Sequence, residues 1–178
     1  MYDVLTIEDW IRRLYQGYRG INDPRRIWIE QYAYPYTILA FSGQTGGAAS
    51  VGNLQINSNA DFVLTRISYT ASLAAAMNTG ALPVVQARAN IVDGGSARPF
   101  FNAAVTLENF AQHSPTGAGR FMSYPRFLSA NTTLQITLTP FGTAAETFSN
   151  IDFLFEGMNI REYSPGMMAS TIGQPQAM

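Results

Sequence analysis

Alternation of apolar and polar residues with a period of two constrains the fold of this 178-residue chain more than any other feature. The clearest example is the segment 133–139, in which aliphatic and polar residues alternate without interruption. Its inward-facing residues are predicted to be Leu134, Ile136 and Leu138. A strand with one buried face has this pattern. Less regular segments of the same kind lie at 26–32, 36–41, 51–56, 62–70, 84–92 and 150–160, with short β pieces at 100–101 and 105–107.

Turn-forming residues separate these segments. Asp93-Gly94-Gly95-Ser96 predicts a tight hairpin turn. We expect 71–82 to be a loop with one turn of helix, and 112–119 to be a loop. No segment after residue 30 predicts a helix long enough to connect parallel strands. The chain is therefore predicted to be mainly β, an antiparallel jelly-roll-like β-sandwich with a short N-terminal helix or arm.

The first thirty residues differ from the rest because they hold ten of the 23 charged residues. Apolar residues at helical spacing predict an amphipathic helix from Thr6 to Gln16, which Gly17 and Gly20 would end. These apolar residues are Ile7, Trp10, Ile11, Leu14 and Tyr15. We divide the chain into a helix and arm (1–30), a β-sandwich domain (31–163) and a C-terminal tail (164–178).

The residue types present exclude most catalytic chemistry. The sequence has no cysteine and no lysine, and His113 is its one histidine, in a loop where a solvated side chain is expected. Asp152 and Glu156 form a possible carboxylate pair of the kind that glycosidases use, but their spacing alone does not bring them together. We predict that the protein is not an enzyme and binds no metal or cofactor.

The charge balance argues against nucleic acid. The net charge is −1, and charged residues make up 13% of the chain, about half of the usual quarter. No run of eighteen apolar residues predicts a membrane span, and the N-terminus lacks the pattern of a signal peptide. Neither nucleic acid nor a membrane is therefore expected as a partner.

Aromatic residues suggest a contact surface. Tyr32, Tyr34 and Tyr36 alternate around Pro35, so their rings are predicted to share one face. They would cover the domain's own core, pack against another protein, or stack on sugars. Residues of the N-terminal helix and of the aromatic segment that follows it are predicted to contact another protein. They are Trp10, Arg12, Arg13, Leu14, Trp28 and Tyr32.

Four stretches together resemble small virion structural proteins of tailed bacteriophages. They are Asn59-Ala60-Asp61-Phe62-Val63-Leu64, Asp93-Gly94-Gly95-Ser96-Ala97-Arg98-Pro99-Phe100-Phe101-Asn102, Tyr124-Pro125-Arg126-Phe127-Leu128-Ser129-Ala130-Asn131-Thr132-Thr133-Leu134 and Phe155-Glu156-Gly157-Met158-Asn159-Ile160. The resemblance covers about residues 55–162. Such proteins are jelly-roll or sandwich modules that decorate the head or sit at the neck and tail.

The resemblance implies a capsid decoration (cement) protein that bridges capsid subunits. Its partners would be the major capsid protein or other virion proteins. It would be made in the host cytoplasm and reside in the virion, as a homo-oligomer in which a trimer is favoured because capsids have local threefold axes. The alternatives are a neck, collar or tail-associated virion protein, and a carbohydrate-binding jelly-roll module that uses Tyr34 and Tyr36.

Overall fold

The structure is a computed structural model that describes residues 4–21, 26–43, 46–74, 83–113, 120–143 and 146–162. Among the described residues, those between 31 and 159 form one compact unit, and 4–21, 26–30 and 160–162 belong to a second. The described end of the last strand, from Ile160, thus groups with the N-terminal helix rather than with the sandwich. The predicted C-terminal tail, 164–178, lies outside the described residues.

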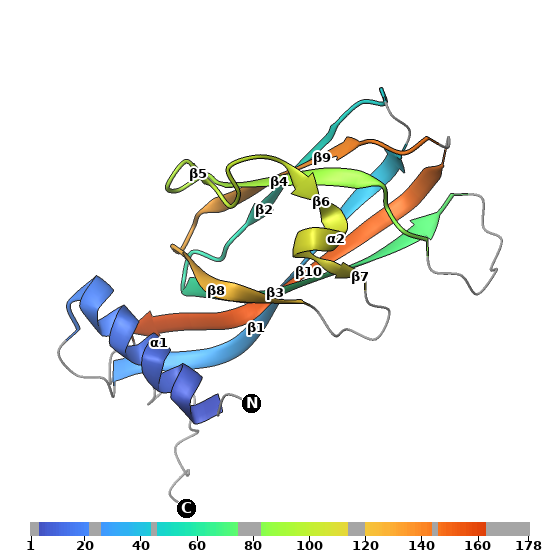
Figure 1. Ribbon diagram of the computed structural model, residues 1–178. Coiled ribbons are helices and arrows are strands. Elements are labelled where there is room, and N and C mark those ends of the chain that lie inside the picture. Colours follow the sequence, from blue (N-terminus) through green and yellow to red (C-terminus); the bar gives the residue numbers. More distant parts are fainter. Residues whose placement is uncertain are drawn as a thin grey trace, which may run out of the picture. The chain divides into compact units, whose positions relative to one another are not determined.

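The larger unit is a β-sandwich of two sheets (Figure 1). The strands are β1 (Ile27–Ser42), β2 (Ser50–Gln55), β3 (Asp61–Leu73), β4 (Ala87–Asp93), β5 (Arg98–Pro99), β6 (Val105–Thr106), β7 (Gln112–His113), β8 (Arg120–Leu128), β9 (Thr133–Pro140) and β10 (Thr147–Glu162). The first sheet has the order β1-β10-β3-β7, with β8 also paired to β3. The second has the order β2-β9-β4-β5, with β6 also paired to β4. The prediction of a mainly β sandwich with a short N-terminal helix is confirmed. The sheets are not wholly antiparallel as predicted, because β7 pairs parallel with β3; the helix α2 (Leu107–Phe110) that precedes β7 brings the chain into the first sheet in that direction.

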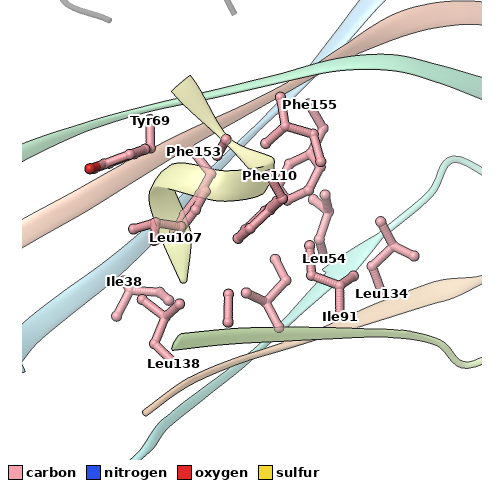
Figure 2. Close-up of a cluster of buried hydrophobic side chains, with 14 of the residues drawn as sticks. Ile38, Leu54, Tyr69, Ile91, Leu107, Phe110, Leu134, Leu138, Phe153 and Phe155 are labelled. Atoms are coloured by element: carbon pink, nitrogen blue, oxygen red, sulfur yellow. The ribbon is translucent and has the colours of Figure 1, made fainter. Parts of the chain in front are cut away.

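The inner faces of the two sheets form the core (Figure 2). The alternation in β9 is confirmed, because Leu134, Ile136 and Leu138 are all fully buried. Phe153 and Phe155 of β10 face them from the first sheet. Each large apolar side chain buried in this way stabilises the fold by about 1.5–3 kcal/mol.

A short helix, α2 (Leu107–Phe110), joins β6 of the second sheet to β7 of the first. Its buried residues, Leu107 and Phe110, point into the core cluster (Figure 2). The sequence predicted only a β piece at 105–107, because a single helical turn is too short to show helical periodicity. The predicted loop at 112–119 is wrong at its start, since β7 occupies 112–113; residues 114–119 lie outside the described part.

Two predicted strands are one in the structure. β1 runs without a break through Pro35, where the sequence predicted a gap between 32 and 36. β1 lies at the edge of its sheet, and an edge strand tolerates a residue that has no N–H to donate. The predicted loop at 71–82 is also wrong at its start, because β3 continues to Leu73; residues 75–82 are outside the described part.

Strand β8 was not predicted. It pairs antiparallel with β3, but the register changes from Leu64 opposite Arg126 to Arg66 opposite Phe121. Residues 122–125 therefore form a bulge in β8, which disrupts the two-residue period that would reveal a strand. Similarly, Phe100 is buried beyond the end of β5 rather than within a strand.

The N-terminal helix, α1 (Val4–Arg19), is longer than predicted at both ends. Thr6 lies inside it and is not its N-cap, and Gly17 lies inside it as well. The helix ends at Arg19, and Gly20 follows it with a φ of 67°. The N–H of Ile21 donates to the carbonyl of Gln16 at 3.2 Å, the bond of a Schellman cap that requires a left-handed residue at this position.

Candidate functional site

The apolar side of α1 is only partly buried. Ile11 and Tyr15 are 2% and 5% exposed, whereas Trp10, Leu14 and Tyr18 are 46%, 53% and 59% exposed. Residues four apart on a helix advance by about 40°, so these last three lie in one row beside the buried pair. The apolar side of the helix therefore has a buried part, Ile11 and Tyr15, and an exposed part, Trp10, Leu14 and Tyr18. We call Trp10, Leu14 and Tyr18 the helix stripe.

Charged residues around the stripe have different roles. The Arg12 guanidinium donates to the carbonyl of Ile27 at 2.6 Å, so this predicted contact residue braces α1 against the start of β1. Arg13 is exposed, as is Asp9. Arg19 lies over the ring of Tyr18, at 5.3 Å from its centroid. Exposed charges therefore border the stripe.

The other two predicted contact residues lie elsewhere. Trp28 is 42% exposed, but it follows the buried Ile27 in β1 and so lies on the opposite face of that strand. Its indole N–H donates to Glu30 at 3.4 Å. Tyr32 is 39% exposed and belongs to the other compact unit. Of the six predicted residues, Trp10 and Leu14 are members of the helix stripe.

The structure brings together Trp10 and Leu14 and adds Tyr18, which the sequence analysis missed. Tyr18 continues the four-residue spacing of Trp10 and Leu14, so the signal was present. The sequence does not predict it because a glycine such as Gly17 is typical of a helix end.

The predicted shared side is confirmed for Tyr32 and Tyr34, whose ring centroids lie 4.8 Å apart, but the tyrosines of β1 are not an open binding face. Tyr34 is buried, with its ring edge-on to Phe62 and its hydroxyl donating to Asn159 at 3.5 Å. Tyr36 packs over Gly52, where an added Cβ would lie 1.6 Å from the tyrosine oxygen. Both rings thus cover the domain's own core, and the carbohydrate-binding alternative loses the residues on which it rested.

The possible carboxylate pair is not brought together. Asp152 accepts hydrogen bonds from Thr37 at 2.6 Å and from Asn150. Glu156 forms an ion pair with Arg66 at 2.6 Å. Residues four apart along one strand are separated by about 13 Å. This is too far for the two carboxyl groups to act on one glycosidic bond.

His113 is half-buried rather than solvated in a loop, which corrects the prediction. It lies in β7, opposite Tyr69 of β3, and the two rings stack with centroids 4.9 Å apart. The buried Tyr69 hydroxyl donates to the carboxylate of Glu108 in α2. Burial raises the pKa of Glu108, and the nearby His113 partly opposes this. The three groups join α2 to the first sheet.

The hairpin turn at Asp93 is confirmed, and it binds a distant segment. The Asp93 carboxylate accepts from the N–H of Gly95 at 2.9 Å and from the hydroxyl groups of Ser96 and Thr132 at 2.5 and 2.7 Å. Burial raises the pKa of Asp93, but these hydrogen bonds together hold it below its usual value. A second buried carboxylate, Asp61, accepts from the N–H of Ala130 at 2.7 Å.

The Asp61 and Asp93 contacts join segments that are far apart in the sequence. The segments 59–64, 93–102 and 124–134 are held to one another by the Asp61 and Asp93 hydrogen bonds. Across the described residues, no group of three or more histidine, aspartate or glutamate side chains gathers in a way that would hold a metal ion. Nor does any described helix have the length and apolar character to cross a membrane.

Comparisons with known proteins add little. No protein-family model matches the chain, and no curated protein matches it in sequence. A solved structure titled "Crystal Structure of FLHE" is similar at a TM-score of 0.34 and 11% identity, over 71% of this chain and 96% of that one.

Proposed function

We propose that this chain is a structural protein of a tailed-phage virion, most directly a capsid decoration (cement) protein that bridges capsid subunits. The observation that carries the proposal is the helix stripe, which leaves two aromatic side chains and a leucine open to solvent. A neck, collar or tail-associated position in the particle is the alternative. The protein would be made in the host cytoplasm and incorporated into the virion.

The stripe has the composition of a protein contact. Tryptophan, tyrosine and arginine dominate the binding energy of interfaces, and an amphipathic helix binds by laying its apolar side into a groove. The exposed Asp9 and Arg13 beside the stripe would select a partner with matching charges. The partner we expect is an apolar groove on the major capsid protein or on another virion protein.

The sandwich is suited to a structural protein. Its buried core and the hydrogen bonds of Asp61 and Asp93 give a rigid module that needs no disulfide or metal. We expect it to act as a homo-oligomer, and a trimer would match the local threefold axes of a capsid.

Mass spectrometry and reconstruction of purified particles test this function. We expect the chain in virions at a copy number that follows the capsid lattice, with density for α1 against a neighbouring subunit. The Leu14→Asp variant should be depleted from particles. Val51→Asp, an equivalent change at a 57% exposed residue of β2, should be retained.

Absence of the protein from virions would overturn the proposal. About a dozen copies at a single vertex would replace decoration by a neck or tail position. Equal incorporation of Leu14→Asp and wild type would show that the stripe is not the contact.

A further inference from the structure

The first sheet has a long strand at each of its edges. β1, with 16 residues, lies at one edge, and β8, with 9 residues, pairs with β3 at the other (Figure 1). Among the described residues, β1 pairs with β10 alone and β8 pairs with β3 alone. The free side of an edge strand presents a row of N–H and C=O groups to which a strand of another chain can add. Strands of this length offer many such groups.

A proline interrupts this row near the middle of β1. Pro35 is exposed and has no N–H to donate, yet β1 continues through it. In sheets, proline is confined to positions where its nitrogen points away from the neighbouring strand, so the ring of Pro35 lies on the free side of β1. A strand added there would lack one hydrogen bond and would meet the ring. Pro35 thus divides the free edge into two shorter pieces, 27–34 and 36–42.

A bulge interrupts the second of these pieces. Ile38 and Phe41 are buried, and both residues between them, Leu39 and Ala40, are exposed, so the alternation contains one extra residue. Ala40 has a φ of 55°, the left-handed conformation found in one class of bulge and rarely adopted by alanine. Such a conformation persists only where the surrounding structure holds it. A bulge bends and twists its strand, which removes the regular spacing that an added strand needs.

The opposite edge of the first sheet has the same two features. The register of β8 against β3 shifts between Arg126 and Phe121, and Pro125 lies within the resulting bulge, 122–125. Arg126 also places an exposed charged side chain on this strand, and charges on an edge strand disfavour the addition of another strand. Both long edges of the first sheet therefore combine a proline with a bulge.

The edge strand β2 of the second sheet lacks both features. β2 pairs with β9 at consecutive positions from Ser50 to Gln55 without a register shift, and this segment contains no proline. It has only 6 residues, and a short edge strand offers few hydrogen bonds to an added strand. The strands β5, β6 and β7 have 2 residues each. The combination of a proline and a bulge thus occurs where strand addition would form the most hydrogen bonds.

We propose that Pro35 with the Ala40 bulge, and Pro125 with the β8 bulge, prevent another copy of this chain from adding a strand to the first sheet. Long edge strands are sites of aggregation unless something blocks them. Neither Pro35 nor Ala40 contributes a buried side chain to the core, so packing does not account for them. The contact in the proposed function would then be made by side chains, as in the helix stripe, and not by strand pairing along these edges.

Restoring the missing N–H groups in the purified full-length chain tests the inference. Pro35→Thr and Pro125→Thr each return a donor to an edge and place a residue there that favours strands. In sedimentation velocity across a wide concentration range, each variant should form higher-order species at concentrations about tenfold or more below those for wild type, because a symmetric pair of copies regains two hydrogen bonds. Far-ultraviolet circular dichroism and the melting temperature of dilute samples would verify that the fold is retained.

Two matched variants separate an open edge from the mere loss of a proline. Pro35→Lys also returns the N–H but adds a charge to the edge, so it should associate like wild type. Pro83→Thr replaces a proline outside every described strand and should do the same.

A folded Pro35→Thr or Pro125→Thr variant that associates like wild type would overturn the inference for its edge. Equal association of Pro35→Lys and Pro35→Thr would overturn it too, since the effect would not depend on an open edge. None of these results bears on whether the protein is found in virions.

Discussion

Replacing Gly157 by alanine should strongly destabilise the sandwich, because β10 passes unusually close to β3 at this residue. A Cβ added to Gly157 would lie 2.0 Å from the carbonyl oxygen of Val63 and 2.9 Å from the ring of Phe62. The first atom belongs to the backbone of a central strand and the second to a fully buried side chain. To reach an ordinary contact, the two strands would have to separate by more than about 1 Å, which a packed interior resists.

Overpacking of this kind costs about 1–3 kcal/mol, and we expect the upper end because backbone rather than a side-chain tip must move. For a chain of this size, a loss of 3 kcal/mol lowers the melting temperature by about 6–12 °C. Thermal unfolding followed by circular dichroism would measure the shift.

Gly17→Ala is the matched control. Gly17 lies within α1, and nothing lies within 4 Å of the position of its Cβ. Alanine at such a site should favour the helix by about 0.5–1 kcal/mol. Glycine-to-alanine substitution is thus expected to lower the free energy of unfolding at position 157 and to raise it at position 17. A Gly157→Ala protein as stable as wild type would refute the close approach of β10 to β3.

Three further changes test the core and the buried carboxylates. Leu107→Ala should lower the free energy of unfolding by about 2–5 kcal/mol, because Leu107 is fully buried between the sheets. Denaturant titrations would measure this loss. An unchanged free energy of unfolding would mean that α2 does not fill the core. Asp93→Asn should be less stable than wild type at neutral pH. The stabilising effect of Asp93 is fully present above its unfolded-state pKa, so the difference should close as the pH falls from there through the lowered folded-state pKa. Glu108→Gln should behave in the opposite way. The pKa of Glu108 is raised, so wild type loses stability as the pH rises through that pKa. The stability of the variant relative to wild type should therefore increase from acid to neutral pH. Melting temperatures of the two proteins that stay in parallel across this range would contradict the burial of the Glu108 carboxyl.

The sequence predicts correctly those features that depend only on residues close together in the chain. The inward residues of β9 were identified from their spacing, because strand alternation is a property of neighbouring residues. The Asp93 turn was found for the same reason. Trp10 and Leu14 were placed on an amphipathic helix, but Gly17 hid the last turn and with it Tyr18.

Pairing between distant strands decided the rest. Pro35 continues β1 because that strand lies at a sheet edge, and β8 exists because β3 offers it hydrogen bonds despite a bulge. Tyr34 became a core residue through contacts with Phe62 and Asn159, far from it in the chain. The local sequence does not show which distant strand or side chain each of these segments pairs with.

The sequence by itself determined the β character, the inward residues of β9 and the supply of reactive side chains, since alternation and residue type are set by the chain alone. Only the tertiary structure decided which strands lie side by side and thus which side chains meet, as Arg66 of β3 meets Glu156 of β10. The physical reason is that a strand's alternation tells which residues share a face, while the neighbouring strands determine what that face contains.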